Sequence, residues 1–181
     1  MVRFKLFIIT LFSISILIAI VNGPIIVESN VYLQALLLFW LFSSLYSHLS
    51  IVVKKGNVNM DYGISYGLAI GLFTGPFGVL IFETLHRFTV YLSRKLSNTA
   101  DPEEFLHTFY NIGAFTINNS IAYLLFIHLY PTFQQIPFGF WLLIILLIIL
   151  VSLLSDLYLI IIFTMTGDIT TRKGAIDFVK K

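Results

Sequence analysis

The residues best suited to chemistry in this sequence are charged side chains inside long apolar stretches. Glu83 and Arg87 are four residues apart, so a helix places their carboxylate and guanidinium on one face, where they can pair. His86 lies next to that face. A bare charge in a bilayer costs about 2.5–3.5 kcal/mol on insertion scales. The three residues therefore form either a self-neutralising ion pair or a site for a ligand or a proton.

A second group of polar side chains lies in the last two apolar stretches. Asn111 and Asn118 are seven residues apart and share a helix face, and Asn119 and Ser120 follow directly. Asp156 is the only acid of the final stretch, and that stretch has no basic residue beside it. These groups either bond to other helices or line a polar pocket. The candidate ligand contacts are Glu83, Arg87, Asn111, Asn118 and Asp156.

The composition indicates which kind of protein must position these side chains. Of the 181 residues, 58% are hydrophobic, and the mean hydropathy is +0.94. Only 11% are charged, compared with about 25% in soluble domains. A soluble core of this length cannot cover so much apolar surface, whereas a bilayer can. We therefore expect one membrane domain whose main partner is the lipid bilayer.

Residue types and motifs that the sequence lacks limit its chemistry. It contains no cysteine, which excludes disulfides, thiol catalysis and thiolate metal sites. Walker, HExxH and G-x-S-x-G motifs are also absent. We therefore expect no enzymatic activity from this chain alone, no metal site and no cofactor. Apart from Arg87, which lies toward the end of its apolar run, the basic residues lie in connections and tails, so they indicate membrane orientation and no nucleic-acid partner.

Apolar runs predict an all-α, polytopic membrane helix bundle of about six transmembrane helices. The third and fourth runs are short and are separated by Gly75-Pro76, which predicts either a tight helical hairpin or a re-entrant pair. Between the second and third runs, β-favouring residues around Lys55-Gly56-Asn57 predict an extended or hairpin-like segment near 49–60. The six runs are 6–27, 31–48, 62–75, 77–93, 105–130 and 138–165.

The basic residues are distributed so that one orientation satisfies all of them. The connections 22–30, 75–76 and 131–137 contain no lysine or arginine. With six spans, the positive-inside rule then predicts a multi-pass protein of a bacterial cell membrane with both termini cytoplasmic. The basic residues are Arg3, Lys5, Lys54, Lys55, Arg87, Arg94, Lys95, Arg172, Lys173, Lys180 and Lys181.

Glycines at a period of four predict a helix-packing face. Each glycine inside a helix costs up to about 1 kcal/mol relative to alanine in water, but in a membrane the missing side chains let two backbones approach closely. Ser15, Ala19 and Gly23 repeat at the same spacing in the first run and predict a second packing face. The glycines of the main face are Gly63, Gly67, Gly71 and Gly75.

The order of short motifs over residues 49–130 resembles a known family. An Ile-Val-Val…Asn-Val-Asn stretch precedes a small-residue helix, then Thr74-Gly75-Pro76, a helix ending in basic residues, a hydrophilic loop at 97–104 and Phe109-Tyr110-Asn111. This order resembles the amino-terminal multi-helix sensor region of bacterial GGDEF and HD-GYP cyclic-di-GMP signalling proteins. That region is itself similar to the substrate-binding S components of energy-coupling-factor transporters.

The resemblance implies a function, and two departures qualify it. It implies that 1–166 form a transmembrane sensor or binding domain for a small molecule or the bilayer state, and that 167–181 form a cytoplasmic tail or linker. No GGDEF, EAL or HD-GYP motif occurs, so we expect the output domain, fused or separate, to be missing from this chain. The alternative is a substrate-binding subunit of a vitamin or metabolite transporter. S components typically carry Ala-x-x-x-Ala in the first span, where this sequence has Ser15-x-x-x-Ala19. A homodimer is left open.

Overall fold

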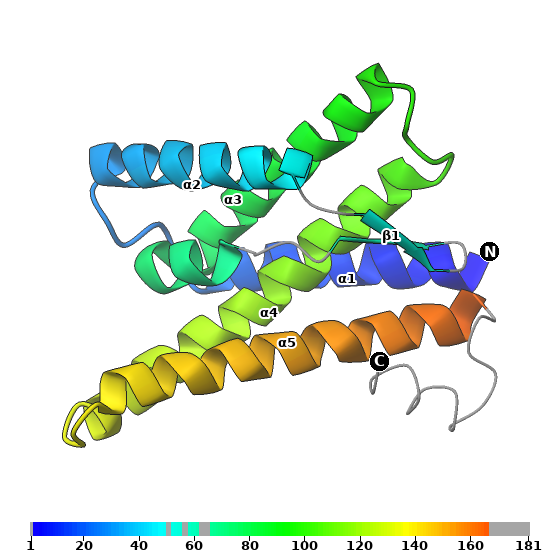
Figure 1. Ribbon diagram of the computed structural model, residues 1–181. Helices are drawn as coiled ribbons and strands as arrows, with labels where there is room; N and C mark the ends of the chain where they lie inside the picture. Colours follow the sequence, from blue (N-terminus) through cyan, green and yellow to red (C-terminus); the bar gives the residue numbers. More distant parts are fainter. Residues whose placement is uncertain (1, 50–51, 56–57, 62–65, 167–181) are drawn as a thin grey trace.

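The protein is a bundle of helices with one pair of short strands (Figure 1). The computed structural model describes residues 2–49, 52–55, 58–61 and 66–166. Five helices occur in this described part of the chain. The elements are α1 Val2–Val21, α2 Ser29–Leu49, β1 Val52–Lys55, β2 Val58–Asp61, α3 Gly67–Leu96, α4 Glu104–Phe133 and α5 Gly139–Thr166.

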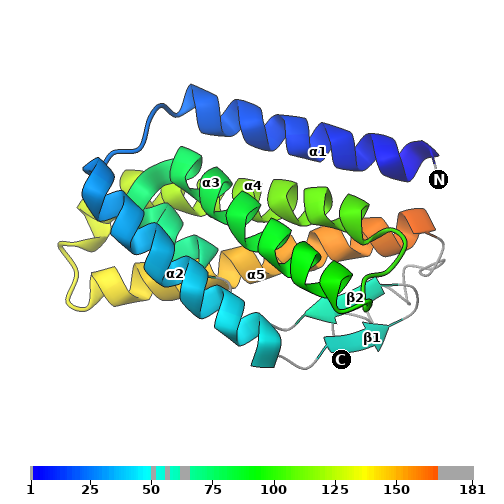
Figure 2. The same ribbon diagram turned by 90° about the horizontal axis from the view of Figure 1, so that it is seen from above.

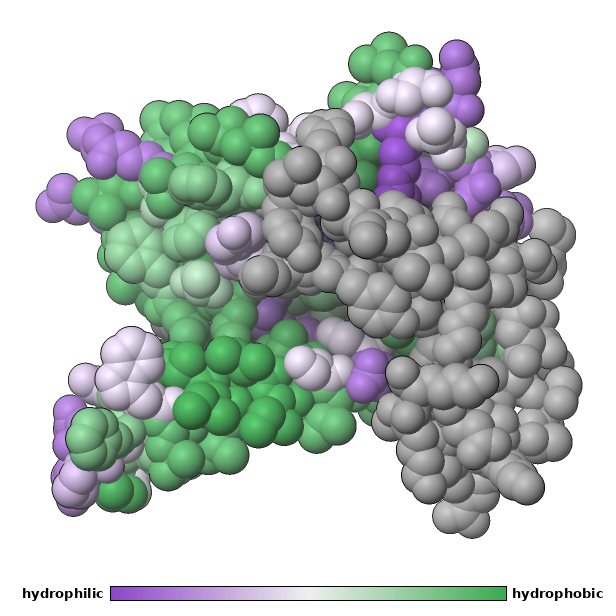
Figure 3. Space-filling model, in the orientation of Figure 1, coloured by the Kyte–Doolittle hydropathy of each residue, from purple (hydrophilic) through white to green (hydrophobic). Residues whose placement is uncertain are grey.

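Four of these helices are long and apolar enough to cross a membrane, so the predicted helical membrane bundle is supported. The four apolar stretches are Phe4–Val21, Gly67–Leu96, Glu104–Phe133 and Gly139–Met165. In α2 the apolar stretch within the described side chains, Ser29–Leu45, is shorter. Figure 3 shows apolar residues over the middle of the visible face and hydrophilic residues toward its ends, as lipid contact requires.

The predicted break at Gly75-Pro76 is confirmed, and it divides α3 into two arms. Gly75 has a φ of +78°, a conformation that glycine adopts easily, and Pro76 follows it inside the helix. A Cβ atom added to Gly71 would lie 2.7 Å from Cγ2 of Val79. In a straight helix these residues would be about 12 Å apart along the axis. The chain therefore folds back at Gly75, and we call 67–74 the short arm and 76–96 the long arm.

The short arm is the described part of the short apolar run predicted for residues 62–75. Its eight residues, 67–74, rise only about 12 Å, less than half of the ~30 Å hydrocarbon thickness. In the described residues the third predicted span is thus a half-length helical arm. Residues 62–65 of the predicted run lie outside the described residues.

Helix α4 lies at the centre of the bundle, and α1, α3 and α5 pack around it (Figure 2). One apolar cluster joins α4 to α1, and it includes Ala114 of α4 with Ile8 and Leu11 of α1. Another cluster joins Ala122 of α4 to Leu143 and Leu147 of α5, with the short arm beside them. Helix α2 packs on the long arm of α3, where the Trp40 indole N–H donates to Thr89 Oγ1 at 3.0 Å.

The strands pair antiparallel, with Val52 opposite Asp61 and Lys55 opposite Val58. They occupy the segment for which the sequence predicts an extended or hairpin-like conformation. Both views place them at the end of the bundle that holds the N-terminus, the α3–α4 connection and the C-terminal end of α5 (Figures 1 and 2).

The opposite end of the bundle holds the α1–α2 and α4–α5 connections. The turn at Gly75 lies there too, because a Cβ atom on Gly75 would be 3.7 Å from Cδ1 of Ile26 in the α1–α2 connection. Lys5, Arg94 and Lys95 are all near the first end. The fold thus separates a basic end from an end whose connections lack lysine and arginine.

Candidate functional site

The candidate site begins with the predicted ion pair on the long arm of α3. Arg87 Nε donates to Glu83 Oε2 at 3.3 Å, and the Glu83 side chain is fully buried while that of Arg87 is 15% exposed. The Arg87 guanidinium carbon lies 4.4 Å from the centre of the Phe115 ring on α4. A cation over an aromatic face is stabilised in addition to its ion pair. The pair is therefore held between α3 and α4.

One oxygen of this buried carboxylate has no partner. Glu83 Oε1 is inaccessible and accepts no hydrogen bond from the described residues. His86, one turn away, stacks on the Phe82 ring with centroids 6.0 Å apart, and its Nδ1 is also buried without a partner in that part of the chain. An unpaired buried polar atom costs about 1–3 kcal/mol. These atoms make the α3–α4 interface more polar than packing alone requires.

The asparagines of α4 extend the polar region toward α5. Asn118 Nδ2 donates to Ser155 Oγ on α5 at 3.1 Å, and this bond uses only the amide nitrogen. Asn118 Oδ1 is buried, and within the described ranges it has no hydrogen-bond partner. Asn119 is fully buried, and both of its side-chain polar atoms lack a partner there too. Its Cβ would lie 3.6 Å from a Cβ atom on Gly71, so Asn119 packs against the short arm.

Three residues of α4 form a stripe that faces the space between α3 and α5. Asn111, Phe115 and Asn118 are spaced by four and three residues, so they lie on one side of the helix. Phe115 contacts Arg87 of α3, and Asn118 bonds Ser155 of α5. Asn111 is half-buried and lies on this stripe nearer the basic end. Four of the predicted ligand contacts therefore surround one region, and Asn119 adjoins them. We call this set the polar cluster: Glu83, Arg87, Asn111, Asn118 and Asn119.

Asp156, the fifth predicted contact, lies elsewhere. It is nine residues, or about two and a half helical turns, from Leu147, which packs against α4. Its side chain therefore leaves α5 on the side opposite the α4 contact and is only half-buried. Ser155, its neighbour, makes the bond to Asn118 instead. The structure does not bring Asp156 to the polar cluster.

The predicted glycine face has more than one role in the structure. Gly71 is buried between Val79 of the long arm and Asn119 of α4. Gly75 forms the turn, so its part in the pattern is conformational. Gly67 is buried at the start of the short arm, and Gly63 lies outside the described residues.

Three residues that shape this region carry no signal of their own in the sequence. Phe115 and Ser155 are ordinary residues in apolar stretches, and only the tertiary contacts select them. Gly113 is the third, because a Cβ atom there would lie 3.0 Å from the backbone nitrogen of Phe12 on α1. Gly113 lies outside any repeat of small residues at a period of four, so its spacing does not mark it as a packing glycine.

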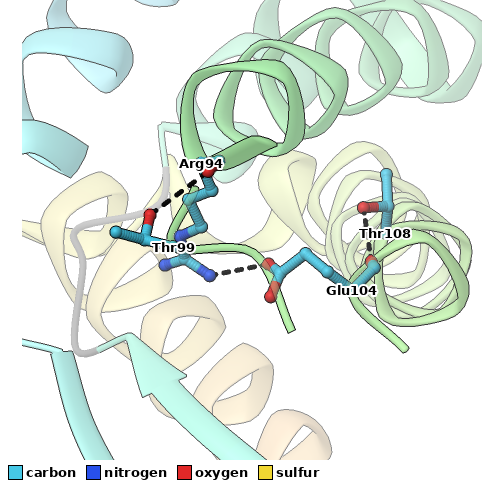
Figure 4. A network of polar contacts seen from close by, with 4 residues as sticks. All are labelled: Arg94, Thr99, Glu104 and Thr108. Carbon is cyan, nitrogen blue, oxygen red and sulfur yellow. Dashed lines mark hydrogen bonds and ion pairs between the residues drawn. The ribbon is translucent and has the colours of Figure 1, made fainter. Parts of the chain in front are cut away.

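A separate polar network ties α3 to α4 at the basic end (Figure 4). Arg94 Nη1 donates to Glu104 Oε1 at 2.7 Å. Thr99 Oγ1 donates to the Arg94 carbonyl at 3.3 Å, and Thr108 Oγ1 to the Glu104 carbonyl at 2.9 Å. Every labelled side chain in this network has a partner, so the network ties the connection to the two helices.

Metal binding receives no support from the described ranges, where no group of three or more histidine, aspartate or glutamate side chains converges. Comparison with protein-family models, with curated proteins and with solved structures finds no match to this chain. The class that the fold defines is a helical membrane bundle with a polar cluster between α3, α4 and α5.

Proposed function

We propose that this chain is a membrane-embedded sensory module that binds a small polar molecule at the polar cluster and signals to a cytoplasmic output. The observation that carries the proposal is the set of buried polar atoms without a partner in the described structure. Four of them surround one region: Glu83 Oε1, Asn118 Oδ1, Asn119 Oδ1 and Asn119 Nδ2.

A purely structural role would use these atoms more fully. The Glu83–Arg87 and Asn118–Ser155 contacts each use one polar atom of a side chain that has two. Each remaining atom costs about 1–3 kcal/mol when it is buried unpaired, and hydrocarbon offers no substitute. A bound polar molecule that donates and accepts hydrogen bonds would remove these costs, which favours a binding site.

Helix α5 provides a route from this site to an output. Ser155 of α5 bonds directly to Asn118 of the polar cluster. From Ser155 the helix continues to Thr166 at the basic end, where residues 167–181 follow. A ligand that changes the Asn118–Ser155 contact would shift the end of α5. The resemblance to cyclic-di-GMP sensors suggests a diguanylate cyclase or phosphodiesterase as the output, fused or separate.

The α1 surface favours a sensor over a transporter subunit. The family of S components uses small residues of the first span to dock a coupling subunit. Here Ser15 and Ala19 are both 0% exposed, and the neighbouring α1 backbone packs against Gly113 of α4. The counterpart of the docking face is thus already covered within this chain.

A ligand screen tests the proposal directly. We expect at least one compound in a panel of polar metabolites to raise the melting temperature of the purified protein, because binding to the folded state alone stabilises it. Asn118→Ala should fold and lose that shift. Ser120→Ala is the matched control, since Ser120 is buried on α4 and lies about half a turn from Asn118. If no compound stabilises the wild type, the binding proposal fails.

The proposed orientation has its own test. Reporter fusions within 97–101 and after Lys181 should both report a cytoplasmic location, and a tag within 131–137 should report the outside. The bundle supports this expectation because the N-terminus and the α3–α4 connection share one end. An external location for 97–101 would overturn the assignment.

A further inference from the structure

One side of α5 is left uncovered by the rest of the bundle. Only 6% of its most apolar stretch is buried, compared with 50% for α3 and 56% for α4. The contacts of α5 lie along the other side, where Leu147 and Ser155 meet α4 and Ile162 joins the cluster between α1 and α4. The uncovered side is apolar over several turns. Its members are spaced by four residues and are 50–58% exposed: Ile145, Ile149 and Leu153.

One carboxylate interrupts this apolar side. Asp156 follows Ile149 by seven residues and Leu153 by three, so it lies on the same side of the helix. It is about 5 Å from the midpoint of the 28-residue helix, well inside a hydrocarbon core of ~30 Å. A carboxylate at that depth is costly unless it has a partner.

The described structure gives Asp156 no such partner. Both of its ion pairs join residues of α3 and α4. The serine hydroxyls nearest to Asp156 along α5 donate to carbonyls of their own helix, Ser152 to Ile148 and Ser155 to Val151. Within the described residues, Asp156 therefore carries an unbalanced charge on the side of α5 that the bundle leaves open.

A second copy of this chain does not supply the missing charge. Two copies in one membrane share an orientation, so a symmetric contact through this side of α5 brings the two Asp156 carboxylates together. Like charges at that distance disfavour each other. Arg87 of the long arm is already paired with Glu83 and is only 15% exposed. The charge that Asp156 requires must therefore come from a different molecule.

We propose that this side of α5 docks against a transmembrane helix of a different protein that carries a lysine or arginine at the level of Asp156. Ile145, Ile149 and Leu153 would pack against that helix, and the opposite charges would pair where no water competes. The inference does not depend on ligand binding at the polar cluster. A partner held here would contact the same helix that bonds to Asn118 through Ser155.

Model helices of defined sequence test the charge requirement. The probes are leucine-rich membrane-spanning peptides that carry lysine, leucine or glutamate at the depth of Asp156, each labelled with an acceptor dye. The full chain carries a donor dye on Gln135→Cys, an exposed position in a sequence without cysteine. In phosphatidylcholine vesicles, energy transfer should show the lysine peptide binding roughly 3–20-fold more tightly than the leucine peptide, as expected for polar contacts between membrane helices. Equal binding of the two peptides overturns the proposal.

Two variants at Asp156 identify the carboxylate as the cause. Asp156→Asn should bind the lysine peptide no better than the leucine peptide, and Asp156→Lys should prefer the glutamate peptide. Ser152→Ala is the matched control, since it removes an exposed polar group one turn away, and it should keep the preference for lysine. A preference for lysine that persists in Asp156→Asn contradicts the proposed pairing.

Folding and self-association are measured on the same proteins. Asp156→Asn should melt no lower than the wild type in the absence of peptide, because its carboxylate has no partner in the described chain. A lower melting temperature would show that Asp156 is paired within the chain, which overturns the docking proposal. Energy transfer between donor-labelled and acceptor-labelled copies of the full chain that changes in Asp156→Asn would make a second copy the occupant, and the proposal of a different protein would fail.

Discussion

The two sides of α4 are packed in opposite ways. Toward α1 the contact is apolar and close, with Gly113 against the backbone of Leu11 and Phe12. Toward α3 and α5 it is polar and incompletely paired, with a carboxylate and two asparagines that keep unbonded atoms. One helix thus holds the bundle together on one side and keeps unpaired polar groups on the other.

The difference separates two kinds of helix contact. Close packing between membrane helices stabilises a bundle without polar groups. Packing alone therefore explains the residues on the α1 side of α4. The α3 and α5 side carries polar atoms that packing does not require and that cost free energy unpaired. Residues of that kind in a membrane are the ones expected to bind or relay something.

The largest effect should come from breaking the ion pair on the polar side. Arg87→Met leaves the Glu83 carboxylate buried without a counter-charge, which should lower the free energy of unfolding by about 3–5 kcal/mol. Adding Glu83→Gln removes the remaining charge and should restore most of that loss. Unfolding in mixed micelles measures both, and additive losses in the double variant would show that the two residues act independently.

A smaller effect is expected on the apolar side. Gly113→Leu places a side chain where backbone atoms of Phe12 lie 3.0–3.1 Å from the first added carbon, and overpacking of this kind costs about 1–3 kcal/mol. Ser13→Leu is the control, because Ser13 is exposed on α1. The melting temperature in detergent should fall for Gly113→Leu alone. Equal melting for both variants would mean that α1 does not rest on Gly113.

The smallest effect should occur within α3 itself. In Gly71→Ala the new methyl group meets Cγ2 of Val79 at 2.7 Å, a side-chain atom that can move, so we expect a loss of about 1 kcal/mol. Val79→Ala in the same chain removes that atom and should recover part of the loss. A double variant less stable than the sum of the two single losses would contradict the folded-back arrangement of the arms.

Much of the fold could be predicted from the sequence because its signals are local. Hydropathy predicts the helical membrane bundle, and Gly75-Pro76 predicts the break in α3. The Glu83–Arg87 pair also follows from spacing alone, since residues four apart on a helix are neighbours. Such features need no knowledge of which helices meet.

Spacing could not settle features that depend on partners far along the chain. Asn118 and Asp156 are both polar residues in apolar stretches, yet only Asn118 belongs to the polar cluster. Gly113 stands outside any glycine repeat, and its role appears only where α1 crosses α4.

The sequence by itself therefore determined that this chain belongs in a membrane, where its helices lie and which charges can pair within one helix. Those properties depend on composition and on contacts within a few residues. Only the tertiary structure decided which polar groups share one region and which atoms remain unpaired. That depends on how α3, α4 and α5 rotate about their axes when they pack, and a change of one residue in helix position turns a side chain by about 100°.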